Sequence, residues 1–441
     1  MFSSHYKDKV SKNIEELVVD IDKERLSKNL IKNKLTASSD NLTKNLPVSI
    51  IPNVIDKKYY DTVVHRTCSV ITKALMNLLY DKEIHSQLNG SNLASLLKNY
   101  GILEKLPTVI TGTARYDMAI TGPQTFDNPP SLIELNLVEV GGMGWVSSLA
   151  KTYLSEIPGL IDYVQPNIMD ISFAKNFRNI GRKFLRVRDD DKNYEDDILF
   201  SESMKPFGIS FFTMPISKFS DKLESSEIKM NNNGVNYKER HYDGLYIRTM
   251  TDEQDIKNYS NIVKAIVESY VSMYDHPSLI LLEDKSRIPL LKQAKNLKKD
   301  EIELLEKIIP KTRSLDSNFV SKLKKNPNDY VLKNTSIHQG KAVYLGDNIS
   351  EKLDNIKDYK GWCVQDFVKF NSMDADVING KNSLGIYSFD CYVNFRYDSR
   401  LREKDKLKFD VPGILVRGSQ NNLVVNVSSG GYFIPSFISR N

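Results

Sequence analysis

A long helical pattern lies between Lys57 and Leu88. Apolar residues recur there at intervals of three and four positions, the spacing that gathers side chains on one face of an α-helix. They are Tyr60, Val63, Val64, Ile71, Ala74, Leu75, Leu78 and Leu79. The pattern predicts an amphipathic helix whose apolar stripe is buried in the core.

The remaining sequence alternates between strand-like and helix-like stretches. Pro107 to Val146 is rich in β-branched residues and glycine, which predicts strands joined by loops. Between Ser155 and Pro277, apolar runs such as FGISFFTMPI alternate with helical stretches such as Ile256 to Met273. The charged segment Glu283 to Lys325 predicts helices with solvated faces, and Tyr330 to Pro435 predicts strands and turns. The fold class we expect is therefore α/β (α+β).

Two polar segments interrupt this pattern. Residues 1–46 carry a lysine-rich helical pattern that ends in the polar stretch Thr36 to Lys44, which predicts a helical extension followed by a linker. The run MNNNGVN, from Met230 to Asn236, predicts a loop or turn.

Composition narrows the classes of protein. The 441 residues include 61 basic and 56 acidic side chains, and a net charge of +5 gives no reason to expect a nucleic-acid partner. No apolar run approaches the roughly 20 residues of a membrane span, so we expect a cytoplasmic protein that does not contact a membrane. The three cysteines form no C-x-x-C pair, which favours reduced thiols over a zinc site or a disulfide framework.

Candidate chemistry begins in the segment SLIELNLVEVGGMG. Strand side chains alternate between the two faces of a sheet, so Glu134 and Asn136 project side by side. A carboxylate and an amide oxygen are hard ligands suited to Mg²⁺, which takes its remaining ligands from water and phosphate. The alternative interpretation is the exposed face of an edge strand.

The upstream segment TARYDMAI repeats this arrangement, with Arg115 and Asp117 two positions apart. If the two strands are neighbours, Asp117 and Glu134 converge into a pair of acids that requires cations between them, while Arg115 is available to a transferred phosphate. The turn that follows, with Gly141, Gly142 and Gly144, brings backbone N–H groups close to a ligand or simply reverses the chain.

Two later segments carry candidate nucleotide contacts. YVLKNTSIHQGKAVYL places Lys333 at a strand end and Lys341 beyond a polar loop, where two cations either clamp phosphate or flank an ordinary hairpin. The spacing fits no P-loop. In the apolar strand WCVQDFV, Gln365 and Asp366 are polar groups suited to an adenine-binding hinge.

The last motif is the hairpin GILVRGSQNNLVVNVSSGGYFIP, whose apolar runs contain Arg417 and Asn426. Arg417 is placed to neutralise charge on a transferring phosphoryl group, or to form a structural ion pair. His241 and His338 lie in polar loops without a second ligand at metal spacing, which predicts surface positions.

The order of these motifs from about Pro47 to the C-terminus resembles the glutathionylspermidine synthetase-like, circularly permuted branch of the ATP-grasp ligases. The resemblance implies an ATP-grasp fold in permuted order with an inserted α/β domain. It divides the chain into a helical extension and linker (1–46), a first part of the core with the metal site (47–160), an inserted substrate domain (161–285), and a helical segment, ATP lid and second core part (286–441).

The resemblance also implies roles for the candidate residues. Asp117, Glu134 and Asn136 correspond to positions that bind two Mg²⁺ ions, and Arg115 and Arg417 to positions that face the transferred phosphate. Lys333, Lys341, Gln365 and Asp366 correspond to ATP-binding positions. Unpermuted ATP-grasp enzymes hold their metals after the lysines, where Asp390 and Asn426 are the competing ligands. The loop NTSIHQGKAV has one glycine where the family usually has several, so we expect a different lid. Since no amidase or other partner domain accompanies the ligase pattern either, the substrate of the family is not carried over.

The activity implied is ATP-dependent ligation of a carboxylate to an amine through an acyl phosphate, with ATP and Mg²⁺ as cofactors. The substrates are small molecules or peptides, free or bound to a carrier protein, and the oligomeric state stays open. No G-x-S-x-G motif and no activated cysteine is present to act as a nucleophile. The alternatives are a nucleotide- or peptide-binding protein without turnover, and an ATP-dependent phosphotransferase.

Overall fold

The protein is described from a computed structural model. The structure describes residues 14, 16–18, 21–33, 35–39, 42–45, 47–88, 92–138, 140–165, 169–189, 195–248, 256–335, 342–378, 383–419 and 431–440. None of the helices within these ranges is both long and apolar enough to cross a bilayer.

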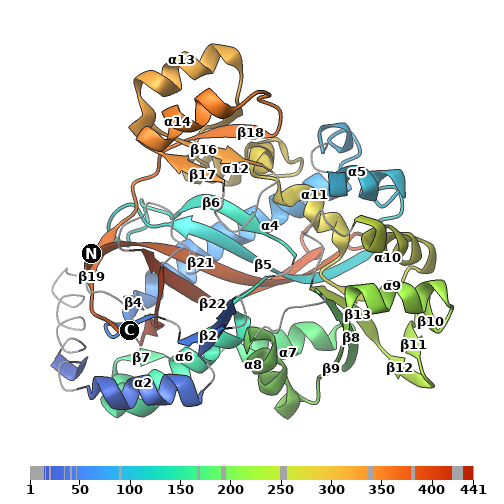
Figure 1. The fold of residues 1–441 in the computed structure, drawn as a ribbon, viewed down its shortest axis with the longest axis horizontal. Helices are drawn as coiled ribbons and strands as arrows, with labels where there is room; N and C mark the ends of the chain where they lie inside the picture. The colour runs from blue at the N-terminus through green and yellow to red at the C-terminus, as the bar shows by residue number, and fades with distance from the viewer. Residues whose placement is uncertain are drawn as a thin grey trace.

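A 12-stranded mixed sheet runs through the molecule (Figure 1). Its main path follows the order β20-β3-β23-β22-β21-β5-β14-β13-β8-β9, with β6 paired to β5 and β19 paired to β21. The strands are β3 (Val48–Ser49), β5 (Val109–Ala119), β6 (Ser131–Asn136), β8 (Lys183–Arg188), β9 (Ser210–Pro215), β13 (Gly244–Arg248), β14 (Met273–Tyr274), β19 (Ser372–Ala375), β20 (Val377–Ile378), β21 (Ser383–Asp398), β22 (Leu407–Ser419) and β23 (Tyr432–Ile434).

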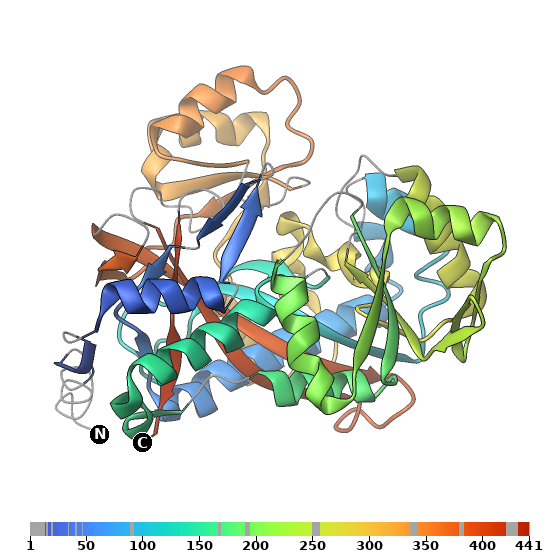
Figure 2. The ribbon, with the colours of Figure 1, turned by 60° about the horizontal axis from the view of Figure 1, so that its bottom comes forward.

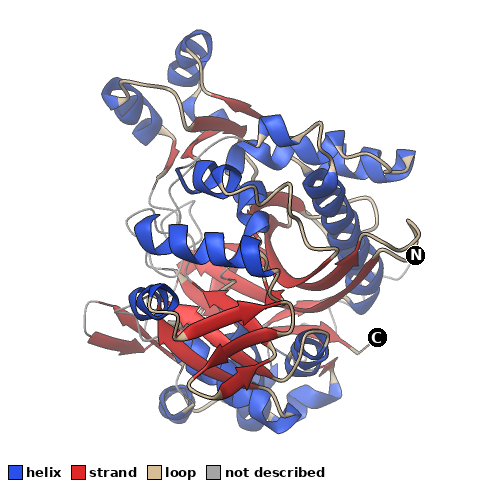
Figure 3. Cartoon of the chain, turned by 90° about the vertical axis from the view of Figure 1, so that its right-hand side faces the viewer, coloured by secondary structure: helices blue, strands red, loops and turns tan. Residues whose placement is uncertain are grey.

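Helices cover both faces of this sheet (Figure 3). The α-helices of the described residues are α2 (Lys23–Lys32), α3 (Lys57–Tyr59), α4 (His65–Tyr80), α5 (Asn92–Asn99), α6 (Met143–Glu156), α7 (Asp170–Arg178), α8 (Glu195–Met204), α9 (Ile216–Glu224), α10 (Ile256–Ser269), α11 (Ile280–Glu283), α12 (Lys299–Ile308), α13 (Ser317–Lys325) and α14 (Asp347–Asn355). Helices α13 and α14 do not cover the large sheet and pack in a separate core. A π-helical segment, η1 (Tyr60–Val64), joins α3 to α4, and 3₁₀ segments include η6 (Pro277–Leu279) and η7 (Lys285–Gln293).

The predicted core helix is confirmed as α3, η1 and α4, which end at Tyr80 rather than at Leu88. Its apolar stripe packs against one face of the sheet, with Tyr116 of β5 and Cys391 of β21 in the same buried cluster. The opposite face packs against α6, and Tyr392 of β21 belongs to that second cluster. Because neighbouring residues of a strand point to opposite faces, the even spacing of Arg115 and Asp117 puts both on the α6 side.

Four parallel strands form one end of the large sheet, in the order β14-β13-β8-β9. A three-stranded antiparallel sheet adjoins them, made of β10 (Ile228–Asn231), β11 (Gly234–Tyr237) and β12 (Arg240–Tyr242). The turn between β10 and β11 lies within the run MNNNGVN, so the turn expected there is present, flanked by short strands. The α/β alternation expected between Ser155 and Pro277 is therefore confirmed, and its strands extend the large sheet.

A second, four-stranded sheet has the order β15-β18-β16-β17 and lies at the top of Figure 1. Its strands are β15 (Thr312–Ser314), β16 (Tyr330–Asn334), β17 (Val343–Leu345) and β18 (Trp362–Asp366). Leu323 of α13 and Ile349 of α14 pack with Leu332 and Val364 in a core of their own, separate from the two cores of the large sheet. We call residues 312–366 the small unit.

The N-terminal region differs from its prediction in one respect. Helix α2 is present and lies along α6, where Arg25 pairs with Glu156 at 2.7 Å (Figure 2). The stretch Thr36 to Lys44, expected to be a linker, instead contains an antiparallel pair of strands, β1 (Thr36–Ser39) and β2 (Leu42–Asn45). Polar residues alone do not exclude a hairpin, because backbone hydrogen bonds satisfy the strands irrespective of their side chains. A further small sheet joins β4 (Asn53–Ile55), β24 (Ser436–Ser439) and β7 (Val164–Gln165).

Candidate active site

Two paired strands bring four of the candidate residues together. Strands β5 and β6 are antiparallel neighbours, with Arg115 opposite Asn136 and Asp117 opposite Glu134. Side chains directly opposite each other in such a pair have Cβ atoms roughly 4.5–5.5 Å apart. The convergence expected if the two strands were neighbours is therefore observed.

Asp117 is surrounded by cationic and amide donors. Arg115 donates from Nε to Oδ1 at 2.7 Å, Asn136 donates from Nδ2 to Oδ1 at 3.1 Å, and Arg417 donates to Oδ2 at 2.7 Å. Burial alone would raise the pKa of Asp117, but the two guanidinium groups outweigh it and hold the pKa below its usual value. Asp117 is therefore an ionised carboxylate fixed between two arginines.

Asp390 lies on the other neighbour of β5, directly opposite Asp117. Arg417 donates from Nε to Asp390 Oδ2 at 2.5 Å, so this arginine bridges the two carboxylates. Asp390 is fully buried, and within the described residues its Oδ1 has no hydrogen-bond partner. Burial raises the pKa of Asp390 to about 6, although Arg417 opposes the shift.

Glu134 faces a lysine from the segment that follows α11. Lys285 lies 3.3 Å from Glu134 Oε1 and is buried. Burial would raise the pKa of Glu134, but Lys285 and the more distant Lys333 bring it below its usual value. Two residues earlier than Lys285, Glu283 accepts hydrogen bonds from the backbone N–H groups of Leu137 and Val138, which fixes the chain that leaves β6.

Lys333 reaches the large sheet from the small unit. Its Nζ lies 2.7 Å from Gln365 Oε1 and 3.3 Å from the carbonyl oxygen of Ile133 on β6. Burial lowers the pKa of Lys333, and Glu134 acts in the opposite direction. Gln365 is buried and directed at Lys333, while the side chain of Asp366 is partly exposed, 3.8 Å from Arg313. The predicted hinge strand is thus β18, paired directly with the strand that carries Lys333.

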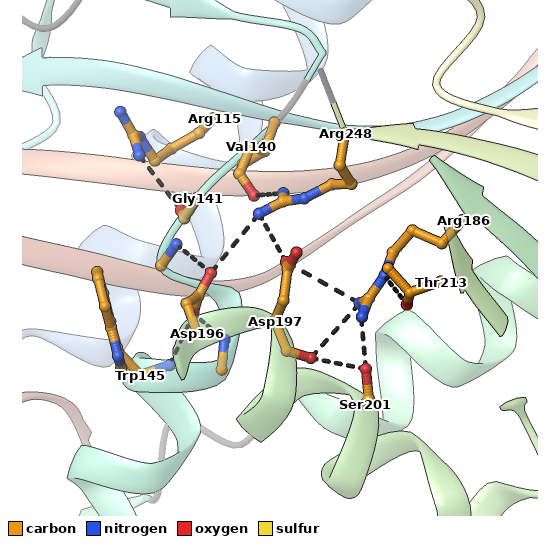
Figure 4. Close-up of polar contacts among 12 residues, drawn as sticks. Arg115, Val140, Gly141, Trp145, Arg186, Asp196, Asp197, Ser201, Thr213 and Arg248 are labelled. Atoms are coloured by element: carbon orange, nitrogen blue, oxygen red, sulfur yellow. Dashed lines mark hydrogen bonds and ion pairs between the residues drawn. The ribbon is translucent and has the colours of Figure 1, made fainter. Parts of the chain in front are cut away.

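Two glycines of the segment after β6, Gly142 and Gly144, have their backbone donors occupied. The N–H groups of Gly142 and Gly144 donate to the carboxylate of Asp196 at 2.9 and 2.7 Å, and that of Trp145 donates to it at 3.2 Å (Figure 4). The sequence left two interpretations of this turn, a ligand contact through backbone N–H groups or a simple chain reversal. The structure agrees with the chain reversal, which leads into α6. The carbonyl oxygen of Gly141 instead faces the site, accepting from Arg115 at 3.3 Å and from Tyr392 at 2.7 Å.

A second cluster of charged residues adjoins this turn (Figure 4). Arg248, at the end of β13, donates to the carbonyl oxygen of Val140 at 2.5 Å and pairs with Asp197 at 2.9 Å. Arg186 of β8 donates to Ser201 at 3.1 Å and lies 4.0 Å from Asp197. The turn therefore connects the strand-borne site to the carboxyl ends of the parallel strands.

The side chains on β5 and β6 differ in whether their oxygens are available to a metal ion. Within the described residues, no three His, Cys, Asp or Glu side chains gather to form a complete metal site. Mg²⁺ bound to a nucleotide needs only one or two protein ligands. Both oxygens of Asp117 already accept hydrogen bonds from donors of this chain, so Glu134 and the Oδ1 atom of Asn136 are the better-placed ligands.

Some candidates cannot be placed. Lys341, Asn426 and His338 lie outside the described residues. His241 is exposed on β12, as expected, and its Nδ1 lies 3.0 Å from Asn236.

Sequence reasoning missed several residues that contribute to the site. Lys285 and Glu283 belong to the segment EDKSRIPLL, where adjacent acids and bases look like an ordinary solvated face. Asp390 entered only as a competing ligand, although an acid in the apolar run IYSFDCYVNF is a usable signal of a buried polar function.

Comparison with known proteins shows the fold. No protein-family model matches the sequence, and no curated protein matches it. The structure resembles that of a glutathione synthetase-like effector, GSS30, from Globodera pallida in its apo form, with a TM-score of 0.66 at 14% identity over 96% of each chain. The match to the ATP-grasp ligase PsnB, whose structure was solved with a minimal precursor, spans 57% of this chain and 89% of the PsnB chain at 11% identity. Its TM-score is 0.29, which does not indicate a shared fold. The chain thus has a fold similar to that of this effector.

Proposed function

We propose that this protein is an ATP-dependent carboxylate–amine ligase with an ATP-grasp core in permuted order and an inserted α/β domain. The observation that supports it best is the pairing of β5 with β6, which sets Arg115, Asp117, Glu134 and Asn136 on one face beside Lys333 of the small unit. Four cations, Arg115, Arg417, Lys285 and Lys333, face three acids, Asp117, Glu134 and Asp390. The excess of positive charge favours binding of a polyanion such as a nucleoside triphosphate.

The nucleotide lies between the small unit and β6. Lys333, held by Gln365, donates to its phosphates. Lys341, which lies outside the described residues, is the second phosphate contact that the sequence predicts. The backbone of β18 at Gln365 and Asp366 lines the adenine pocket. Lys285 supplies a further positive charge beside Glu134.

Glu134 and Asn136 would hold Mg²⁺ together with the phosphates, while Asp117 orients Arg115 and Arg417. When bound, magnesium would neutralise phosphate charge. The two guanidinium groups face the transferred phosphoryl group and stabilise its charge. Because the arginines already share Asp117, they require little reorganisation when the substrate binds.

The reaction has two displacements. A carboxylate oxygen of the first substrate attacks the γ-phosphorus, and the bond to the β-phosphate oxygen breaks to release ADP. The amine nitrogen of the second substrate then attacks the acyl carbon, inorganic phosphate leaves, and the nitrogen loses a proton to give the amide. The protein contributes positioning and electrostatic stabilisation to both steps.

The test is formation of ADP and phosphate by the purified chain with ATP, Mg²⁺ and pools of carboxylates and amines. The reaction should require both pools, and mass spectrometry should find an amide. Glu134→Gln should lower turnover on the order of a thousandfold, because a metal bridge contributes several kcal/mol of transition-state stabilisation. Glu306→Gln, an exposed change on α12, is the matched control.

Other outcomes would contradict the proposal. Nucleotide binding without ADP formation in any pool would indicate a binding protein. A phosphorylated product that forms without the amine would indicate a phosphotransferase. Near-normal turnover of Glu134→Gln at saturating Mg²⁺ would remove the metal site from β6.

A further inference from the structure

A wide cavity lies at the opposite end of the parallel strands from Arg248. Its volume is about 1290 Å³, and its floor contains Lys183 and Ser210, the first residues of β8 and β9. The turns that flank β11 contribute Asn232, Asn233 and Glu239 to its wall. The cavity is therefore built from the amino ends of strands whose carboxyl ends adjoin the candidate active site.

Unneutralised cations gather in this cavity. Arg182, Lys183 and Arg240 are exposed, and no acidic side chain among the described residues lies within ion-pair distance of any of the three. Arg178 is also part of the lining and donates to the carbonyl oxygen of Phe207 at 2.7 Å. Elsewhere on the described surface, many lysines and arginines have acidic partners, such as Lys324 with Asp354 at 2.5 Å.

The two acids of the lining offset these cations only in part. Asp243 Oδ2 accepts from the backbone N–H groups of Arg182 and Lys183 at 2.6 and 2.9 Å, so this carboxylate fixes the start of β8. Glu239 lies in a turn with φ of 59°. Four cationic and two acidic side chains leave the lining with a formal charge of +2 before His241 is counted.

The lining also offers groups that bind a ligand without charge. The amides of Asn232 and Asn233 are exposed donors. Phe212 is 38% exposed, and its ring is held by Tyr242 and Tyr237 at centroid distances of 5.7 and 6.1 Å. A fixed aromatic surface beside cations and amides suits a ligand that carries several anionic groups on a compact skeleton.

We infer that this cavity binds a small polyanion bearing phosphate or sulfate groups, at a site separate from the proposed ATP site. Arg182, Lys183 and Arg240 pair with its anionic groups, and Asn232 and Asn233 donate to them. Exposed cations are stable in water without a partner, but these three line one cavity together with two amides and a fixed aromatic ring. The inference does not depend on the proposed ligase activity.

The test is titration calorimetry with inositol hexakisphosphate as the phosphate probe and sucrose octasulfate as the sulfate probe. Binding should weaken as the salt concentration rises, because exposed charge pairs are screened. The triple variant Arg182→Ser, Lys183→Ser, Arg240→Ser should bind on the order of tenfold more weakly or worse. The exposed lysines of the control triple Lys357→Ser, Lys360→Ser, Lys404→Ser lie outside the cavity, and affinity should not change.

The two probes separate the sources of the anion: tighter binding of one identifies a phosphate or a sulfate ligand, and either result supports the site. Circular dichroism and thermal unfolding check that the triple variant is folded, and Arg240→Ser alone provides a milder second variant. No binding of either probe, or an equal loss in both triples, would overturn the inference. The inference would also be overturned if Lys333→Ala abolished binding of the probes while the triple variant Arg182→Ser, Lys183→Ser, Arg240→Ser still bound them. The probes would then occupy the nucleotide site.

Discussion

At the scale of single residues, the burial of ionisable groups is the feature that most affects this protein. Asp275 is 2% exposed and adopts a positive φ of 56° after β14. Its Oδ1 accepts from the backbone N–H of Thr113 at 2.8 Å, and its Oδ2 has no hydrogen-bond partner within the described residues. Burial raises the pKa of Asp275 from 3.8 to about 8. The folded protein therefore keeps a proton that the unfolded chain releases.

This difference predicts how stability depends on pH. Between about pH 4 and pH 8 the folded state binds the proton of Asp275 and the unfolded state does not, so stability falls as the pH rises. The slope for this group is roughly 1.4 kcal/mol per pH unit. Asparagine resembles the protonated acid but does not titrate, so Asp275→Asn should lose this pH dependence. At pH 8 the variant should be more stable than the wild type.

Urea unfolding at pH 5, 6, 7 and 8 measures the effect. Asp221→Asn, at an exposed position of α9, is the control and should keep the pH dependence of the wild type. Identical pH dependence in Asp275→Asn and the wild type would mean that Asp275 is ionised in the folded protein at neutral pH.

At the scale of elements, the turn into α6 depends on close approach between backbones. A Cβ atom on Gly144 would lie 2.4 Å from the carbonyl oxygen of Asp196 and 2.7 Å from the backbone nitrogen of Phe200. Gly142 has a φ of 89°, and its Cβ would lie 2.5 Å from the hydroxyl of Tyr392. Helices α6 and α8 therefore pack closely because Gly144, in the first turn of α6, carries no side chain, and the absence of a side chain on Gly142 leaves room for Tyr392.

Gly144→Ala should destabilise the protein by about 1–3 kcal/mol or more, because both nearest atoms belong to the backbone and cannot rotate away. Gly141→Ala is the matched control in the same turn, since nothing lies within 4 Å of its Cβ position. Its effect on the free energy of unfolding should stay within about 0.5 kcal/mol. Chemical denaturation of both variants measures the difference, and equal losses would contradict the packing argument.

At the scale of the whole molecule, the candidate site lies between two separately packed parts. The small unit has its own core, and Lys333 of that unit contacts the large sheet through the carbonyl oxygen of Ile133 at 3.3 Å. A ligand held by Lys333 on one side and by Glu134 on the other would link these parts. Nucleotide binding is thus expected to slow local opening of the small unit.

Hydrogen exchange with and without a non-hydrolysable ATP analogue and Mg²⁺ tests this expectation. Strands β16 and β18 should exchange more slowly with the analogue. Lys333→Ala should lower nucleotide affinity by roughly tenfold or more, because a charge-assisted contact contributes about 1.5–3 kcal/mol. Lys325→Ala, at the exposed end of α13 in the same unit, is the control. If Lys333→Ala bound the nucleotide as tightly as the wild type, and if the analogue slowed exchange in β16 and β18 to the same extent in both proteins, the nucleotide would lie elsewhere.

The sequence by itself determined the local elements and the faces of the strands. Periodicity of three and four predicted the core helix, although to Leu88 rather than to its end at Tyr80. Alternation put Arg115 with Asp117 and Glu134 with Asn136, because these properties depend only on residues close in the chain. The α/β class followed from the same patterns.

Tertiary structure alone decided which strands are neighbours and therefore which charges meet. Arg417 lies 300 positions from Asp117 and Lys285 lies 151 from Glu134, and no periodicity relates residues so far apart. The same holds for Asp196, whose carboxylate occupies two backbone donors of the glycine turn. Pairing across the sheet brings these groups together, and the burial that results shifts their pKa values, so the electrostatics of the site exist only in the folded chain.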